Sequence, residues 1–325
     1  MNQKVKWSIL AAVACVFWGI SGLFGKNLFN SNPLITPIFL TKIRMVISGI
    51  IILLFAAITK QKPFAIWKNK KDALNVAAYG LLGLVPVQLF YFIVVKEANA
   101  SIATILQFVG PFFVIFWMLI TKQQVYRNLD LISATLAFLG VFLLATHGNL
   151  QTLTLSPGAL LFGMLSAVGV ATNTLIPRRL VSLYPTAVIT GWGLLIAGIA
   201  LFILNPSVPK ISITFGMITD LSGVIVIGTL IPFQWMAGAL RYISPSTASL
   251  LDAFEPISAM IGSILVFNLA LTPMDIIGSV IIIGAVLLVS LNPPRLTKKA
   301  HRWCAFYFTL NITVHNTAFD NYIVN

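Results

Sequence analysis

The chain has 325 residues, of which 58% are hydrophobic and only 9% are charged, and its formal net charge is +13. Because about a quarter of the residues in a soluble globular domain are charged, this composition excludes an ordinary soluble domain. The positive charge does not indicate binding to nucleic acid, since the basic residues form no compact patch interleaved with aromatic side chains.

Ten apolar segments follow one another along the chain, and each is long enough for an α-helix to cross a bilayer core of about 30 Å. The long apolar runs lack the alternation of a membrane β-barrel strand. Helices remain, because backbone groups in lipid must be hydrogen-bonded within the segment. We expect an all-α membrane protein whose ten transmembrane helices cover residues 7–28, 38–58, 74–95, 101–120, 129–145, 157–176, 186–204, 221–240, 247–267 and 273–291.

Lysine and arginine are unevenly distributed among the gaps that separate these segments. Most of the 21 such residues lie before the first segment, after the last one, and in alternate gaps between them. The other gaps contain only Lys26, Lys96 and Lys210. Under the positive-inside rule, this pattern predicts a multi-pass protein of a bacterial-type inner (plasma) membrane with both chain ends in the cytoplasm.

The third and fourth segments resemble the eighth and ninth. Residues 83–88 match residues 228–234 with one residue inserted. Such short matches are weak singly, but a register kept over three consecutive pairs of segments indicates a repeat. The residues that match at one constant spacing are Ala103 with Ala248, Pro111 with Pro256, and Asp130 with Asp275.

The repeat predicts how the chain is divided. We expect two five-helix repeats, residues 1–148 and 149–294, followed by a cytoplasmic tail, residues 295–325. A unit of five helices starts on one side of the bilayer and ends on the other, so its copy is inserted upside down. Inverted repeats are typical of secondary transporters, which bind substrate near the midplane between the two halves and work by alternating access.

Several residues at set places in the segments are similar to those of a known family. They are Phe17, Trp18 and Gly19 in the first segment, Arg44 in the second, Pro111 in the fourth, Gly140 in the fifth, Glu255 and Pro256 in the ninth, and Gly284 in the tenth. With the two halves, they resemble the drug/metabolite transporter superfamily, and within it the EamA-type ten-helix permeases. The resemblance implies a secondary transporter that exports amino acids or related metabolites.

The chain departs from that family at the ends of the fourth and ninth segments. The family usually has a glutamate there, whereas this sequence has Lys122 and Gln123 at the first place and Asn268 and Leu269 at the second. A structural or coupling role of those carboxylates is therefore not carried over to this chain.

Ionisable residues inside a membrane span are costly and are candidates for function. Asp252 and Glu255 are three residues apart, on one face of the ninth helix. We expect Glu255, with Asp252, to line a central cavity, and either to titrate with transport or to pair with Arg44. The alternatives are that Asp252 is a hydrated residue at the cavity entrance, and that Lys42 and Arg44 extend to the lipid headgroups.

Prolines and polar residues within the spans complete the candidate site. Proline opens a helix locally, which suits the wall of a cavity, and the expected helix breaks are Pro86, Pro111, Pro232 and Pro256. The alternative for the glutamines is hydrogen bonding between packed helices, and for the aromatic residues it is contact with lipid. The further candidates for the cavity are Gln88, Gln234, Trp18, Tyr91 and Asn173.

No sequence motif indicates an enzyme. There is no Walker A phosphate-binding loop, no metal-ligand spacing and no nucleophile elbow, so we expect no enzymatic activity, metal or cofactor. The expected partners are a small-molecule substrate and the lipid bilayer, with a proton as a candidate coupling ion, and the chain is expected to be a monomer or homodimer. The alternatives to an amino-acid exporter are a multidrug or sugar-type metabolite transporter and a non-transporting membrane scaffold.

Overall fold

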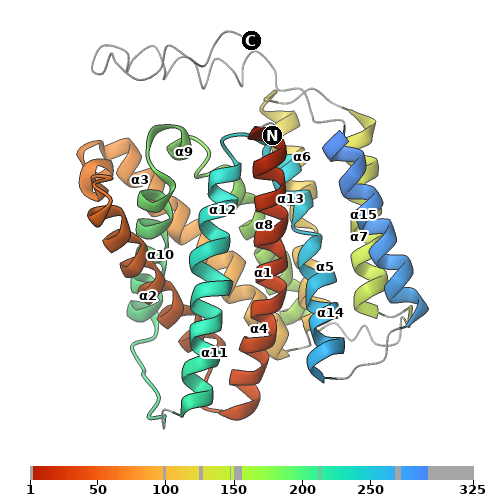
Figure 1. Cartoon of the computed structure of the whole chain (residues 1–325), viewed down its shortest axis with the longest axis horizontal. Coiled ribbons are helices and arrows are strands. Elements are labelled where there is room, and N and C mark those ends of the chain that lie inside the picture. Colours follow the sequence, from red (N-terminus) through yellow and green to blue (C-terminus); the bar gives the residue numbers. More distant parts are fainter. Residues whose placement is uncertain are drawn as a thin grey trace.

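The computed structural model describes residues 3–97, 100–123, 127–146, 148–149, 156–211, 214–267 and 272–291. All regular secondary structure in these ranges is helical (Figure 1). Within the described residues, seven helices are long and apolar enough to cross a membrane, and three shorter apolar helices accompany them. The predicted fold class, an all-α membrane protein with ten transmembrane helices in two inverted five-helix repeats, is confirmed. The predicted tail, residues 295–325, lies outside the described residues.

The first repeat contains five spans, two of which are broken. The first two spans are α1 (Gln3–Ser31) and α2 (Pro37–Ile58), and a short 3-10 helix, η1 (Pro63–Lys68), follows them. The third is made of α3 (Lys70–Ala78), the π-helical segments η2 (Tyr79–Leu84) and η3 (Pro86–Phe90), and α4 (Tyr91–Glu97); the fourth of α5 (Ala100–Gln107) and α6 (Gly110–Ile120); and the fifth of α7 (Asn128–Thr146).

The second repeat is broken at the same two places. The sixth and seventh spans are α8 (Pro157–Leu175) and α10 (Thr186–Leu204), with the short α9 (Leu180–Leu183) between them. The eighth is made of α11 (Phe215–Ile225), the π-helical η5 (Val226–Leu230) and α12 (Ile231–Ala239); the ninth of α13 (Pro245–Leu251) and α14 (Phe254–Phe267); and the tenth is α15 (Pro273–Leu291).

Local sequence explains where several spans begin. The side chains of Thr36, Ser156 and Ser244 each accept a hydrogen bond from the backbone N–H three residues further on, and a proline follows each of them directly. A serine or threonine cap satisfies an N–H that would otherwise have no partner. Proline suits the next position because it has no N–H to lose.

The two repeats are interlocked. The first span, α1, packs against the eighth and ninth spans of the other repeat, while the sixth span, α8, packs against the third and fourth. We call the first group (α1, α11, η5, α12, α13 and α14) the α1 wall, and the second (α8, η2, η3, α4, α5 and α6) the α8 wall. The remaining spans form symmetric pairs, α2 with α10 and α7 with α15 (Figure 1).

Glycines permit the closest contacts within each wall. A Cβ on Gly19 of α1 would overlap the side-chain oxygen of Ser258 and the carbonyl oxygen of Glu255, and would lie 2.8 Å from the backbone nitrogen of Ala259. A Cβ on Gly169 of α8 would lie 2.5 Å from the backbone nitrogen of Val87. Because membrane helices associate largely through close packing, these glycines determine how closely each crossing span approaches the other repeat.

Polar contacts join the two repeats at both ends of the bundle. We call the end that carries the start of α1, the start of α3 and Arg241 the basic end. There, Arg179 Nη2 lies 2.7 Å from Oδ1 of the buried Asp72 in an ion pair. At the opposite end, Asn27 Nδ2 donates to Asp220 Oδ2 over 2.7 Å. In both repeats, therefore, an aspartate early in a broken span (the third or the eighth) binds a residue of the other repeat, which lies in the first span or just after the sixth.

Further contacts at the basic end join parts of the two repeats. The hydroxyl of Tyr184 donates to Asp72 Oδ2 over 2.8 Å, and Arg241 Nη2 donates to the carbonyl oxygen of Tyr184 over 2.6 Å. Burial and the hydrogen bond to Asp72 raise the pKa of Tyr184 to about 12, so the hydroxyl remains a donor at neutral pH.

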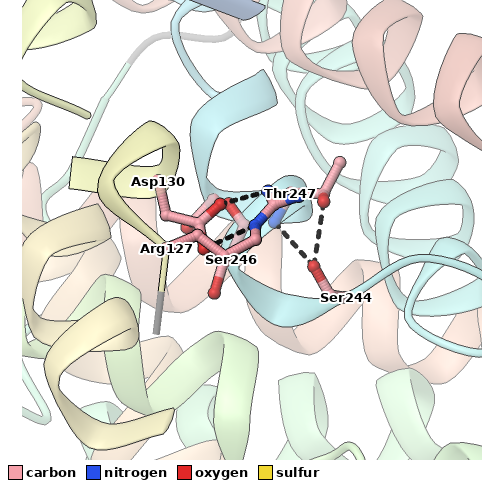
Figure 2. A network of polar contacts seen from close by, with 6 residues as sticks. Arg127, Asp130, Ser244, Ser246 and Thr247 are labelled. Carbon is pink, nitrogen blue, oxygen red and sulfur yellow. Dashed lines mark hydrogen bonds and ion pairs between the residues drawn. The ribbon is translucent and has the colours of Figure 1, made fainter. Parts of the chain in front are cut away.

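A second network at this end lies where α7 and α13 begin. Figure 2 shows the ion pair between Arg127 and Asp130 lying against Ser246 in the first turn of α13. Beside it, the hydroxyl of Ser244 caps that turn by accepting the backbone N–H of Thr247 over 3.1 Å. The network thus lies between the fifth span of one repeat and the ninth span of the other.

We predict that Asp72→Asn lowers the free energy of unfolding by about 1.5–3 kcal/mol, because hydrogen bonds to charged groups contribute about that much. The substitution removes the negative charge that pairs with Arg179 in this ion pair. Tyr184→Phe removes only the neutral donor to Asp72 and should cost about 0.5–1.5 kcal/mol. Thermal unfolding of both variants in detergent measures the difference. Equal stability of the two variants would contradict a structural role for the ion pair.

Candidate functional site

A cavity with a volume of about 100 Å³ lies between the α1 wall and the α8 wall. One water molecule needs about 10–15 Å³ of such space, so the cavity has room for several waters or for part of a small solute. Both walls and α2 contribute to the lining. From the α1 wall and the residues between α13 and α14 these are Trp18, Ser21, Gly22, Phe233, Met236, Ala248, Asp252, Glu255 and Pro256. From the α8 wall and the residues between α5 and α6 they are Val87, Gln88, Tyr91, Phe92, Gln107, Phe108, Pro111, Val170, Asn173 and Thr174, and from α2 it is Arg44.

The acidic residues of the cavity lie at the break of the ninth span. Pro256 has no N–H to donate to the carbonyl of Asp252, as a continuous helix would require. That carbonyl accepts the N–H of Glu255 over 3.0 Å instead, and the helix restarts at Phe254. Asp252 therefore lies between α13 and α14, and Glu255 lies in the first turn of α14, where the helix dipole favours negative charge. The thiol of Cys15 donates to Asp252 Oδ1 over 3.5 Å.

The fourth span is broken in the equivalent way, but the polar residue before its break is the neutral Gln107, where the ninth span has Asp252. Pro111 follows the gap between α5 and α6, and Gln107 ends α5. The amide nitrogen of Gln107 donates to the carbonyl oxygen of Val87 and to the hydroxyl of Ser166, both over 2.9 Å. These bonds hold Gln107 against the third and sixth spans, so the α8 wall presents amides to the cavity where the α1 wall presents carboxylates.

Arg44 is the basic residue of the cavity. It is only 4% exposed, although α2 begins just seven residues before it, at Pro37. Its guanidinium carbon lies 5.2 Å from the centre of the Phe92 ring, within range of a cation–π interaction. Two of its nitrogens, Nε and Nη2, have no hydrogen-bond partner among the described residues. The indole nitrogen of Trp18 and the amide oxygen of Asn173 are likewise buried without a partner.

The structure brings most of the predicted site residues to this one cavity. Two predicted helix breaks, Pro86 and Pro232, lie at breaks of the third and eighth spans but are not in its lining. The predicted residues that line it are Trp18, Arg44, Gln88, Tyr91, Asn173, Asp252 and Glu255, together with the prolines Pro111 and Pro256.

Gln234 requires a correction. It does not line the cavity, and its amide nitrogen donates to the hydroxyl of Thr190 in α10. The cause is the residue inserted in the eighth span, because one residue turns the following side chains by about 100° around a helix. At the spacing that relates Pro111 to Pro256, the equivalent of Gln88 is Phe233, and Phe233 lines the cavity.

Lys42 and Arg44 do not extend to lipid headgroups. Lys42 is fully buried, and its Nζ donates to the carbonyl oxygens of Asn205 and Ser207 over 2.6 Å each. It fastens the segment after α10 to α2. Arg44, two residues further along α2 and therefore on another face of the helix, lines the cavity instead, so the two cations have different roles.

Gln107 is a site residue that sequence reasoning missed, although the repeat contains the signal for it. The spacing that relates Pro111 to Pro256 also relates Gln107 to Asp252. Applying that spacing to the acidic residue would have identified the glutamine. Phe92, by contrast, is one of many phenylalanines in apolar sequence, and nothing in its local pattern separates it from residues that face lipid.

The family is established by comparison of the sequence with known protein families. The profile of the EamA-like transporter family matches residues 5–146 and again residues 157–291. The chain belongs to the EamA-like transporter family. The two matches fall on the two five-helix repeats described above, so the predicted resemblance to EamA-type permeases is confirmed.

Individual EamA-like relatives are similar over most of their length. The chain is 31% identical over 304 residues to the uncharacterized inner membrane transporter YicL of Salmonella typhimurium, covering 92% of this chain and 100% of that protein. It is 23% identical over 269 residues to the uncharacterized transporter YdfC of Bacillus subtilis, covering 81% and 85% of the two chains. A solved crystal structure shares the fold with a TM-score of 0.73 at 15% identity, covering 88% of this chain and 97% of that one.

Proposed function

We propose that this EamA-like chain is a secondary transporter that moves a small polar metabolite by alternating access, and that its substrates are amino acids or related metabolites that it exports. The observation that carries the proposal is the central cavity, which holds Arg44, Asp252 and Glu255 between two interlocked repeats. Charged groups inside a bilayer are costly. A non-transporting scaffold has no need of them and would fill this space with apolar side chains.

The arrangement of the walls supports alternating access. Each wall combines one unbroken span of one repeat with two broken spans of the other, and the cavity lies between the walls. Rocking of one wall against the other would expose the same cavity to each side of the bilayer in turn, as in other inverted-repeat transporters. The glycine contacts and the hydrogen bond between Asn27 and Asp220 lie within the walls, so each wall can move as a unit.

The nature of the cavity favours amino acids over sugars or amphipathic drugs. Amino acids carry both charges, and the cavity contains a guanidinium, two carboxylates and several amides. Its volume of about 100 Å³ also favours a small solute over a drug-sized one. We place the protein in a bacterial-type inner membrane with both chain ends in the cytoplasm, which rests on the distribution of lysine and arginine and on the similarity to YicL.

Counterflow in proteoliposomes tests the proposal. Purified protein is reconstituted with an internal load of unlabelled amino acid, and uptake of neutral, aromatic and sulfur-containing labelled amino acids is measured with and without a pH gradient. We expect accumulation of at least one of them, and a change of its rate with the gradient if a proton is the coupling ion. Protein that is folded but accumulates none of the panel would contradict the assignment to amino acids.

A further inference from the structure

One edge of the Arg44 guanidinium makes no hydrogen bond to any described residue. Nε and Nη2 lie side by side on a guanidinium, and their N–H groups form the planar fork that binds the two oxygens of one carboxylate. Both nitrogens are buried, and neither has a hydrogen-bond partner among the described residues. Nearly all buried polar groups in proteins are hydrogen-bonded, so a buried charged fork with two free donors calls for an explanation.

Neighbouring groups hold this edge ready for an incoming ligand. Phe92 lies 5.2 Å from the guanidinium carbon, which restrains the plane of the group through its face and makes no hydrogen bond to its edge. Glu255 lines the same cavity but accepts no hydrogen bond from Nε or Nη2. Glu255 therefore leaves both donors on this edge of Arg44 without a hydrogen-bond partner among the described residues.

The charges of the cavity determine what a ligand must carry besides a carboxylate. Two carboxylates, Asp252 and Glu255, face one guanidinium, so a ligand with only negative charge would increase the excess of negative charge in a medium of low dielectric constant. A ligand that also carries an ammonium group would offset it. Trp18 and Asn173 add one free donor and one free acceptor, respectively, for neutral parts of the ligand.

We propose that the ligand of this cavity is an α-amino acid or a closely similar zwitterion, with its carboxylate bound by Nε and Nη2 of Arg44 and its ammonium group facing Asp252 and Glu255. This inference rests on the proposed transport function and deepens it, because it assigns each end of the substrate to named residues. Recognition requires both charges of the ligand, and Arg44 is the residue that distinguishes a carboxylate from its neutral counterpart.

Competition by matched analogues tests the requirement for both charges. Counterflow of labelled L-alanine and L-phenylalanine is measured against unlabelled amino acid, against the amides alaninamide and phenylalaninamide, which lack the carboxylate, and against propionate and 3-phenylpropionate, which lack the amino group. We expect each amino acid to compete at least tenfold more strongly than either of its analogues. Equal competition by the amides overturns the assignment while leaving the transport function intact. Absence of counterflow for both labelled amino acids would instead count against the proposed function itself.

Substitution of Arg44 tests the residue. We expect Arg44→Gln to lower amino-acid counterflow at least tenfold and to abolish the preference for amino acid over amide, and Arg44→Lys to give an intermediate loss, because lysine keeps the charge but not the fork. Lys71→Gln, at an exposed lysine outside the cavity, is the matched control. An unchanged preference in folded Arg44→Gln protein overturns the proposal. If that variant does not fold, the analogue competition on the unmodified protein decides.

Discussion

Replacing Glu255 by glutamine is expected to lower the rate of substrate accumulation at least tenfold and to remove its response to a pH gradient. Glutamine keeps the size of the side chain and its hydrogen-bonding oxygen, but it can neither carry a negative charge nor release a proton. A hydrogen bond to a charged group contributes about 1.5–3 kcal/mol, and about 1.4 kcal/mol corresponds to a tenfold change. Glu255 lines the cavity with Asp252 and Arg44, so we expect loss of its charge to weaken the interaction with a substrate bound there.

The measurement is counterflow at two pH values and with an imposed gradient. Glu97→Gln is the matched control, since Glu97 ends α4 as an exposed carboxylate and is not part of the cavity lining. Asp252→Asn separates the two acids: a loss of rate with the gradient response retained would assign substrate contact to Asp252 and coupling to Glu255. Full transport with unchanged pH dependence in Glu255→Gln would show that neither role belongs to this residue.

Most ends of the predicted spans lie within two residues of the helix ends because the bilayer imposes the length of a span, whereas α1, α3 and α11 begin four to six residues earlier than predicted. The seventh and tenth predicted spans, residues 186–204 and 273–291, coincide with α10 and α15. The third was predicted as residues 74–95, whereas α3 begins at Lys70, because the first helical turn there is charged and lies beyond the apolar run. Hydropathy finds the part of a helix that lies in lipid, and caps such as that of Asn69 determine where the helix itself begins.

The site could be predicted where the cost of burying charge identifies a residue, and not where packing decides. Asp252, Glu255 and Arg44 were found because ionisable residues in lipid are rare. Lys42 carried the same signal, yet it binds two backbone carbonyls and does not line the cavity. Sequence shows that a buried charge needs partners, but whether those partners are backbone groups of a loop or an incoming ligand depends on the tertiary structure.

The repeat contained more information than the motifs did. At its constant spacing, the repeat makes Gln107 equivalent to Asp252 and Gln88 equivalent to Phe233, and all four residues line the cavity. The short match between residues 83–88 and 228–234 instead aligns Gln88 with Gln234, which donates to Thr190 in α10 and not into the cavity. Register determines which face of a helix a residue occupies. A constant spacing is therefore a better guide to equivalent positions than the identity of a short motif.

Replacing Gly19 by alanine is expected to lower the free energy of unfolding by about 1–3 kcal/mol, the usual cost of an overpacked contact, and to impair transport. The added methyl group would overlap Ser258 Oγ and the carbonyl oxygen of Glu255, so α1 and α14 would have to move apart. Because Glu255 lies in the first turn of α14, that separation shifts the acidic side of the cavity. The motif that carries Gly19 thus acts through packing that positions the charge.

Gly22, one turn along the same helix, is the matched control, since a Cβ there meets nothing within 4 Å. Gly22→Ala should unfold at nearly the temperature of the unmodified protein in detergent, whereas Gly19→Ala should unfold measurably lower. Removing only the nearest side-chain atom should not restore stability: Gly19→Ala combined with Ser258→Ala still leaves the methyl group against the backbone of Glu255 and Ala259. Rescue by the second substitution would show that a hydroxyl, and not the approach of two backbones, limits this contact. Unimpaired stability of Gly19→Ala would mean that α1 and α14 do not pack as closely as described, and the position of Glu255 in the cavity would then lose its structural basis.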